Sequence, residues 1–264
     1  MLDKSTYREA FHRDAAALAS AARRGLAAPV PSCPGWTVAT LVTHLTGIYA
    51  HRVKLVRVRA QENVVQAYED LDLPPELKDW FDAEHEDLSK MPPGLLDLFE
   101  RTAAELEAVL WSVEPDEPVW TWWAADQTAG FWQRRMAQET AVHRWDAQLA
   151  HGQTEPIEAQ LACDGIDEVL DVMVPMRRHW AQSTRTGAGE SYHFHRTDGP
   201  GEWLVRFEPD RVVITREHAR GDVAVRGAAS DLLLFLWHRI PADRLDVFGD
   251  AALLERFFEL VPPD

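Results

Sequence analysis

Four long segments with apolar residues at helical spacing occupy the first 150 residues of this 264-residue chain. The predicted helices run over 4–24, 38–59, 95–111 and 129–150. Turn-forming stretches that contain glycine or proline separate them, as is typical of helix ends. Long helices joined by loops bury their apolar faces by packing against one another. The sequence therefore predicts an antiparallel four-helix bundle over residues 1–151.

The pattern changes after the fourth helix, and we expect a second domain over residues 155–264. A helical segment, 156–180, contains Pro175, which predicts a kink or an early end. Short β-rich runs separated by turn signals follow at 191–196, 202–207, 211–216 and 222–225. The last helical segments, 228–237 and 251–260, are expected to cover one face of the sheet. The prediction is a small α+β domain with an antiparallel meander, and so a two-domain α+β protein.

Two connections in the first domain carry their own signals. The segment 29–37 contains three prolines, which exclude a helix or a central strand. Its Cys33 and Trp36 are residue types that prefer burial, so we expect an ordered loop. Thr37 is predicted to cap the helix that follows. The segment 61–90 is acidic and is interrupted by the sequence LPPE, which predicts a helix, a break and a short helix.

Charge and cysteine content exclude several classes of function. The net charge is −16, and phosphate groups need a basic face, so nucleic acid and anionic membranes are not expected partners. Two cysteines, Cys33 and Cys163, are too few and too far apart for a disulfide framework. The N-terminus has no apolar signal core, and the longest apolar run, 232–237, is too short to span a bilayer. We expect a cytoplasmic protein.

The helical segment 129–150 holds the first candidate functional residues. Glu139 and His143 are four residues apart and therefore lie one above the other on one helix face. Asp146 extends that face by another turn. A carboxylate and an imidazole at this spacing can bind one metal ion. The same spacing is also typical of a surface ion pair, so the pair alone leaves both interpretations open.

His44 is a third candidate, on the predicted helix 38–59. It lies between Leu41 and Ile48 at the edge of the apolar stripe, where a side chain points into the bundle. One interpretation is a core histidine that is hydrogen-bonded to a neighbour. The other is a metal ligand, because bundles build metal sites from polar side chains that project inward from facing helices.

Four motifs occur in order along nearly the whole chain. They are PSCPGWT at 31–37 followed by LVTHL around His44, ETAVHRWD at 139–146, TDGPGEW at 197–203 and RGAASDLLLFLW at 226–237. Together they resemble the mycothiol-dependent maleylpyruvate isomerase family of actinobacteria, whose N-terminal domain is a DinB-like four-helix bundle. The resemblance implies that His44, Glu139 and His143 coordinate a divalent metal ion, usually zinc.

The implied chemistry depends on a thiol. Two imidazoles and a carboxylate leave one position of a tetrahedral zinc ion open, as in catalytic sites. The resemblance implies that mycothiol, the cosubstrate, is deprotonated there. The expected reaction is addition of the thiolate to a cis double bond, rotation about the resulting single bond, and elimination to the trans product. Asp146 is a candidate catalytic residue that handles a proton or supports a ligand, and a salt bridge with Arg144 or Arg177 is the alternative.

Positive charge is also needed near the metal, to hold an enolate and two carboxylates. The inward neighbours of the candidate ligands on the fourth helix are uncharged: Trp132, Met136 and Val142. The resemblance points to Arg239 as a catalytic residue from the second domain, with the active site between the two domains. Family members commonly have glycine before this arginine, and this chain has His238. Capping of the helix 228–237 is the alternative role for Arg239.

Two further functions stay open. Many members of the superfamily resemble thiol S-transferases, which conjugate the thiol to an electrophile. A non-catalytic metal- or ligand-binding regulatory module is the other, although the intact set of His44, Glu139 and His143 argues against it. The expected partners are a small-molecule electrophile and a low-molecular-weight thiol, and the expected assembly is a monomer or a small homo-oligomer.

Overall fold

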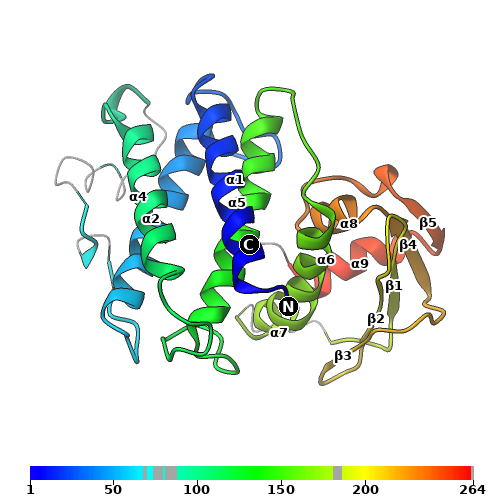
Figure 1. The fold of residues 1–264 in the computed structure, drawn as a ribbon. Helices are drawn as coiled ribbons and strands as arrows, with labels where there is room; N and C mark the ends of the chain where they lie inside the picture. Colours follow the sequence, from blue (N-terminus) through cyan, green and yellow to red (C-terminus); the bar gives the residue numbers. More distant parts are fainter. Residues whose placement is uncertain (68–69, 74–79, 81–87, 181–185, 263–264) are drawn as a thin grey trace. The chain divides into compact units, whose positions relative to one another are not determined.

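The computed structural model describes residues 1–67, 70–73, 80, 88–180 and 186–262 of the chain. The chain divides into two compact units, Met1–Glu155 (unit 1) and Pro156–Asp264 (unit 2). Unit 1 is helical, and unit 2 combines helices with a five-stranded sheet (Figure 1). The predicted two-domain α+β class is confirmed. Among the described residues, no helix is both long and apolar enough to cross a lipid bilayer.

Four long helices form unit 1. They are α1 (Lys4–Ala22), α2 (Val38–Arg57), α4 (Leu95–Leu110) and α5 (Ala129–Leu149), with a short 3-10 helix, η2 (Leu88–Lys90), before α4. Helix α1 packs along α5, α2 packs along α4, and α2 also meets α5 (Figure 1). The predicted bundle is confirmed, and each helix ends within two residues of its predicted boundary.

The start of α2 is set by its sequence. Thr37 has an extended backbone, and its hydroxyl accepts a hydrogen bond from the backbone N–H of Thr40 at 3.3 Å. In return, the Thr40 hydroxyl accepts one from the N–H of Thr37 at 3.3 Å. This capping box satisfies N–H groups that the first helical turn leaves without partners. The predicted cap is confirmed, and it starts the helix about two turns before His44.

Aromatic side chains join the helices of the bundle. Phe11 of α1 meets Tyr49 of α2 with ring centroids 5.4 Å apart, and Tyr49 meets Phe99 of α4 at 5.7 Å. All three side chains are fully buried. The Tyr49 hydroxyl lies 2.6 Å from the hydroxyl of Thr140 on α5, so the polar end of the ring is satisfied inside the core. This contact holds α2 against α5 beside Glu139.

Helix α5 is buried around nearly its whole circumference, charged side chains included. Arg144 is one of them, and its Nε donates to the buried carboxylate of Asp14 on α1 at 3.2 Å. Arg144 also donates to the backbone oxygen of Glu155 at 2.5 Å. A buried guanidinium is tolerated only when its charge and its N–H groups find such partners. The pair therefore ties α1 to α5 at one point.

The segment 61–90 departs from its prediction where the structure describes it. Residues 61–67 form no helix, because the Asn63 side chain accepts the backbone N–H of Val65 at 3.1 Å in place of a helical partner. Among the described residues near the predicted short helix, Trp80 is helical and 88–90 form the 3-10 turn η2. Much of the remaining prediction falls on 68–69, 74–79 and 81–87, which lie outside the described residues.

Unit 2 contains helical elements before and after a sheet. The helical elements are α6 (Ala159–Glu168), a π-helical turn η3 (Val169–Met173), α7 (Val174–Trp180), α8 (Ala229–Leu236), a 3-10 turn η4 (Ala242–Arg244) and α9 (Ala252–Leu260). The strands are β1 (Ser191–Arg196), β2 (Glu202–Phe207), β3 (Val212–Thr215), β4 (Val223–Gly227) and β5 (Asp246–Gly249). The π-helical turn lies just before Pro175, which lacks the N–H that a continuous helix needs.

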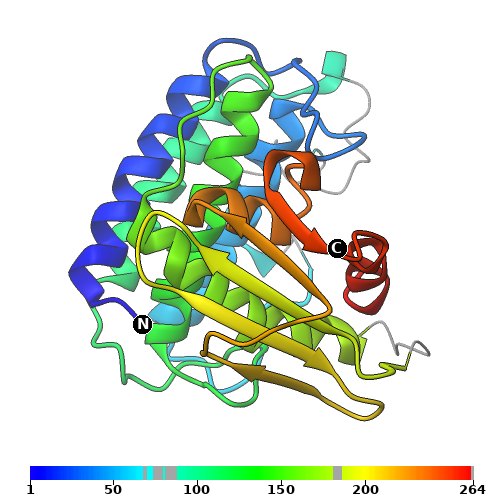
Figure 2. The same ribbon diagram turned by 90° about the vertical axis from the view of Figure 1, so that its right-hand side faces the viewer.

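The strand order is β3-β2-β1-β4-β5 (Figure 2). Pairs β1–β2, β2–β3 and β4–β5 are antiparallel, so the predicted antiparallel sheet is confirmed for most of its pairs. The simple meander was wrong at β1–β4, which pair in parallel. The cause is the connection 216–222, which leaves the edge strand β3 and crosses β2 and β1 to reach β4. Strand β5 was not predicted.

The two faces of the sheet differ in chemistry. Tyr192 and Phe194 of β1 and Phe207 of β2 surround Phe257 of α9, with ring centroids 5.1, 5.7 and 5.7 Å from it. Helix α9 therefore covers one face, as predicted. Side chains alternate between the faces of a strand. The intervening residues of β1, His193 among them, consequently lie on the opposite face.

Removing the buried carboxylate between α1 and α5 is expected to destabilise the fold. Asp14→Ala removes the carboxylate that pairs with the buried Arg144 guanidinium, and we expect the free energy of unfolding to fall by about 3–5 kcal/mol. Chemical denaturation of the full chain measures this. The control is Arg8→Ala, which breaks the exposed pair of Arg8 with Glu107 and should cost at most about 1 kcal/mol. Equal losses in the two variants would contradict the expectation.

Candidate metal centre

His44, Glu139 and His143 meet where α2 faces α5. The Nε2 atoms of both histidines lie 3.3 Å from the same Glu139 oxygen, Oε1. Spacing by four on α5 places Glu139 beside His143, and the packing of α2 on α5 brings His44 to them. The structure thus brings all three predicted ligands together. Nitrogen and oxygen ligands about 2.0–2.1 Å from one tetrahedral ion lie roughly 3.3 Å apart, so the donor set fits a divalent metal such as zinc.

The loop 29–37 provides one wall of this cluster. Trp36 lies against His44 with ring centroids 5.0 Å apart, and it stacks on His143 at 6.0 Å with the ring planes 16° apart. A backbone bridge between Pro29 and Thr37 closes the loop on itself. The sequence predicted an ordered loop here, but it gave no indication that Trp36 would lie over both imidazoles.

Asp146 orients His143 from behind. Its Oδ2 lies 2.9 Å from His143 Nδ1, and its Oδ1 accepts a hydrogen bond from the Ser32 hydroxyl at 2.6 Å. The Cys33 thiol lies 3.6 Å from Oδ2. A carboxylate at Nδ1 favours a proton on Nδ1, which leaves Nε2 as the ring atom that can bind a metal ion. Asp146 therefore lies where a residue that supports a metal ligand would lie.

A second grouping shares His143. Atoms of Cys33, His143 and Asp146 that can bind a metal lie within 4.8 Å of one another, as do those of His44, Glu139 and His143. The imidazole presents Nδ1 to the first group and Nε2 to the second. Because the short contact to Asp146 uses Nδ1, the donor set with His44 and Glu139 is the better candidate for an ion.

Two arginines that the sequence interpretation missed surround Glu139. Arg135, one turn earlier on α5, donates to Glu139 Oε2 at 2.8 Å and is buried. The guanidinium of Arg52 lies 4.0 Å from the centre of the Trp132 ring. The expectation that the inward neighbours of the candidate ligands are uncharged therefore missed two cations that act on Glu139. The spacing of Arg135 four residues before Glu139 was the signal that could have found it.

These charges shift the pKa values of the site. Burial acts to raise the pKa of Glu139, but Arg135, His143 and His44 outweigh it and hold that pKa well below its usual range. Burial acts to lower the pKa of His143, but its bonds to Asp146 and Glu139 outweigh it and raise the pKa to about 9. Burial lowers the pKa of Arg52 to about 9, against the attraction of Glu139. The metal-free cluster thus pairs an anionic carboxylate with a cationic imidazole.

Arg239 lies in unit 2, directly after α8. His238 before it has a φ of 59°, the left-handed conformation that glycine adopts most easily. The N–H of His238 bonds to the Phe235 oxygen at 2.8 Å, and that of Arg239 to the Leu234 oxygen at 2.7 Å, which together end the helix in a Schellman motif. The Arg239 guanidinium donates to the Trp237 oxygen at 2.8 Å. A helix-end contact is therefore present, and a catalytic role for Arg239 stays a prediction.

The raised pKa of His143 predicts how the stability of the metal-free protein depends on pH. Its folded pKa, about 9, exceeds the ordinary value of 6.5, so its stabilising contribution is complete below about pH 6.5 and is lost as the pH rises through about 9. NMR titration of the His143 ring and thermal melting across this range measure both effects. Asp146→Asn removes one anion and should lower the pKa of His143. Titration of the wild-type ring near 6.5 would contradict the expectation.

Comparisons with known proteins show the family to which this chain belongs. The family model of the mycothiol maleylpyruvate isomerase N-terminal domain matches residues 7–148, and that of the C-terminal domain of the same family matches residues 160–256. Crystal structures of the mycothiol-dependent maleylpyruvate isomerase and of a histidine-to-alanine mutant share the fold, each with a TM-score of 0.62 and 95% of both chains covered. Their sequence identities to this chain are 15% and 13%. The comparison with curated proteins gives no match. Because the two family models together span most of the chain, the protein belongs to the mycothiol maleylpyruvate isomerase family of enzymes.

Proposed function

We propose that this enzyme is an isomerase of the maleylpyruvate type that uses mycothiol and a divalent metal ion held by His44, Glu139 and His143. One observation carries the proposal: the Nε2 atoms of two histidines from different helices converge at 3.3 Å on one Glu139 oxygen, in a chain of this family. Zinc is the first candidate, because two imidazoles and one carboxylate are a donor set that zinc uses in catalytic sites. Such an ion, when bound, supplies the charge that lowers the pKa of a thiol.

The residues around the ligands reduce their freedom. Arg135 holds one oxygen of Glu139, which leaves the other facing the histidines. Asp146 holds Nδ1 of His143 and is itself held by Ser32. Ligands fixed in this way need little reorganisation during the reaction. We assign Asp146 to positioning, since its contacts run to a ligand and to the loop 29–37.

The proposed reaction needs no net gain or loss of atoms. The thiolate sulfur bonds to one carbon of the cis double bond, and the electron pair of that bond moves onto the conjugated carbonyl as an enolate. Rotation about the new single bond follows. Return of the electron pair expels the thiolate and leaves the trans isomer. The protein must hold the enolate and both carboxylates in place while the bond turns.

Positive charge for this task has two proposed sources. Arg52 is half-buried against the Trp132 ring, and its buried Nε has no hydrogen-bond partner among the described residues. A buried donor without a partner is costly, and an anionic substrate group would satisfy it. Arg239 is the second source, proposed from its place in the family motif. His44, with about a third of its side chain exposed, is the ligand that an incoming thiol would meet first.

The metal prediction concerns each ligand separately. His44→Ala, Glu139→Gln and His143→Gln should each lower the zinc content of the purified protein by about one ion per chain. Elemental analysis after gel filtration measures this, and melting temperatures show that each variant is folded. The matched control is another histidine–carboxylate pair of unit 1, His12 and Glu107, whose atoms lie 2.9 Å apart at the surface. His12→Gln and Glu107→Gln should keep the full zinc content. Unchanged zinc in all three ligand variants would rule out this centre.

The activity prediction separates isomerase from S-transferase. With maleylpyruvate and a small amount of mycothiol, we expect a product of unchanged mass and full recovery of the thiol. An S-transferase would instead consume the thiol in proportion to product, and mass spectrometry distinguishes the two. In the same assay, Arg239→Ala and Arg52→Met should lower kcat/KM by about 10²–10³ if each binds the developing anion. Full activity with unchanged metal would remove that arginine from the mechanism.

A further inference from the structure

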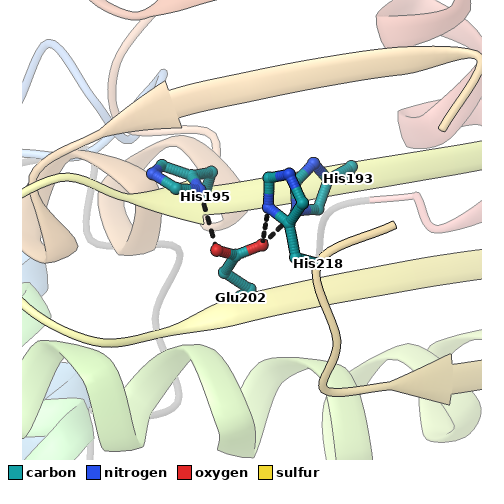
Figure 3. Close-up of side chains that lie close together, drawn as sticks. All are labelled: His193, His195, Glu202 and His218. Atoms are coloured by element: carbon teal, nitrogen blue, oxygen red, sulfur yellow. Dashed lines mark hydrogen bonds and ion pairs between the residues drawn. The ribbon is translucent and has the colours of Figure 1, made fainter. Parts of the chain in front are cut away.

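Three histidines and one glutamate gather on the sheet face of unit 2 that lies opposite α9. His193 and His195 alternate with Tyr192 and Phe194 along β1, so both imidazoles project from the same face. Glu202 is the direct antiparallel partner of His195 on β2 and therefore shares that face. Figure 3 shows the two imidazoles and the carboxylate pointing toward one another.

His218 reaches the same cluster from the connection 216–222. This connection leaves β3 at the edge of the sheet and crosses β2 and β1 to reach β4. Arg216 joins the connection to the helices of unit 2 through ion pairs with Asp167 of α6 at 2.7 Å and with Asp171 of η3 at 2.5 Å. His218 lies on the opposite face, with its Nδ1 2.6 Å from Glu202 Oε2 (Figure 3).

The four side chains share one small volume. His193 Nε2 lies 3.0 Å from Glu202 Oε2, and His195 Nδ1 lies 3.2 Å from Oε1 of the same carboxylate. One potential metal-binding atom from each of the four residues lies within 4.8 Å of the other three. The His193 side chain is only 8% exposed, whereas that of His218 is 78% exposed. The cluster therefore has a rigid base on two strands and one ligand on a connection.

The donor atoms of the cluster suit a particular class of metal ion. The three imidazoles offer nitrogen donors, and the Glu202 carboxylate offers an oxygen donor. Borderline divalent ions such as zinc prefer this set, and hard ions such as magnesium and calcium do not.

We propose that His193, His195, Glu202 and His218 form a second metal site, which binds zinc and fastens the connection 216–222 to the sheet. Four protein ligands complete a tetrahedral zinc ion, so the site is closed and structural. It shares no residue with the centre of unit 1 and does not depend on the function proposed for that centre. Zinc binding should change mainly the connection 216–222. Three of the ligands already lie on the paired strands β1 and β2, and only His218 lies on the connection.

The alternative is a hydrogen-bonded cluster that needs no ion. A carboxylate can accept several N–H groups, and three imidazoles can donate them. The two cases differ in what happens when metal is added. A hydrogen-bonded cluster gains nothing from zinc, whereas a zinc site binds the ion, takes up its geometry and becomes more rigid.

The experiment uses the full chain with the centre of unit 1 disabled by His44→Ala and Glu139→Gln. We expect this variant to bind about one Zn²⁺ per chain, and Co²⁺ in its place should give the intense visible absorption of tetrahedral coordination. Adding His218→Gln should weaken binding by at least about 100-fold, more than the loss of an outer partner causes. His218 is largely exposed, so this variant should fold. His193→Gln is the second ligand variant, and His12→Gln is the control that should leave binding unchanged.

Limited proteolysis is a second test, which needs neither an enzyme assay nor a count of bound zinc ions. Arg220 is exposed within the connection 216–222, and trypsin can cleave after it. Zinc should protect this bond in the wild-type protein and should fail to protect it in His218→Gln. The proposal is overturned if the disabled variant binds no zinc, if His218→Gln binds it equally well, or if zinc leaves cleavage after Arg220 unchanged. None of these outcomes bears on the centre of unit 1, which the wild type and His218→Gln share.

Discussion

A carboxylate inside a helical bundle is stable only where positive charge and N–H donors surround it, and Glu139 is placed under that condition. Arg135 comes from the same helix, His143 from the next turn, and His44 from the facing helix. Asp146 in turn holds His143, and Trp36 lies against His44. The packing of α2 on α5 completes this shell, and the loop 29–37 covers it.

Features that depend on local spacing were predictable from the sequence. Helical periodicity located the four helices, Thr37 marked the start of α2, and a spacing of four put Glu139 beside His143. Alternation and turn residues located β1 and β2 to the residue. Where periodicity was weak the prediction was wrong, as it was over 61–67, because a side chain of the Asn63 type offers the backbone another partner.

Features that depend on contacts distant in the sequence were not predictable. Nothing local shows that Ser32 will bind Asp146, more than a hundred residues away, or that Arg52 will lie on Trp132. The parallel pairing of β1 with β4 has the same origin, since it depends on how the connection 216–222 crosses the sheet. The cluster around Glu202 follows from that crossing, because His218 reaches the strands only through it. Family motifs indicated three ligands, but the groups that orient them had to be seen in three dimensions.

The loop 29–37 touches the candidate centre without supplying any of its three proposed ligands. Ser32 and Cys33 contact the carboxylate that orients His143, and Trp36 covers both imidazoles. Substitutions in this loop can change the basicity of an imidazole and the access of water while His44, Glu139 and His143 stay the same. Enzymes with identical ligand sets can therefore diverge in reactivity through a surface segment, and a survey of ligand residues alone would not detect the divergence.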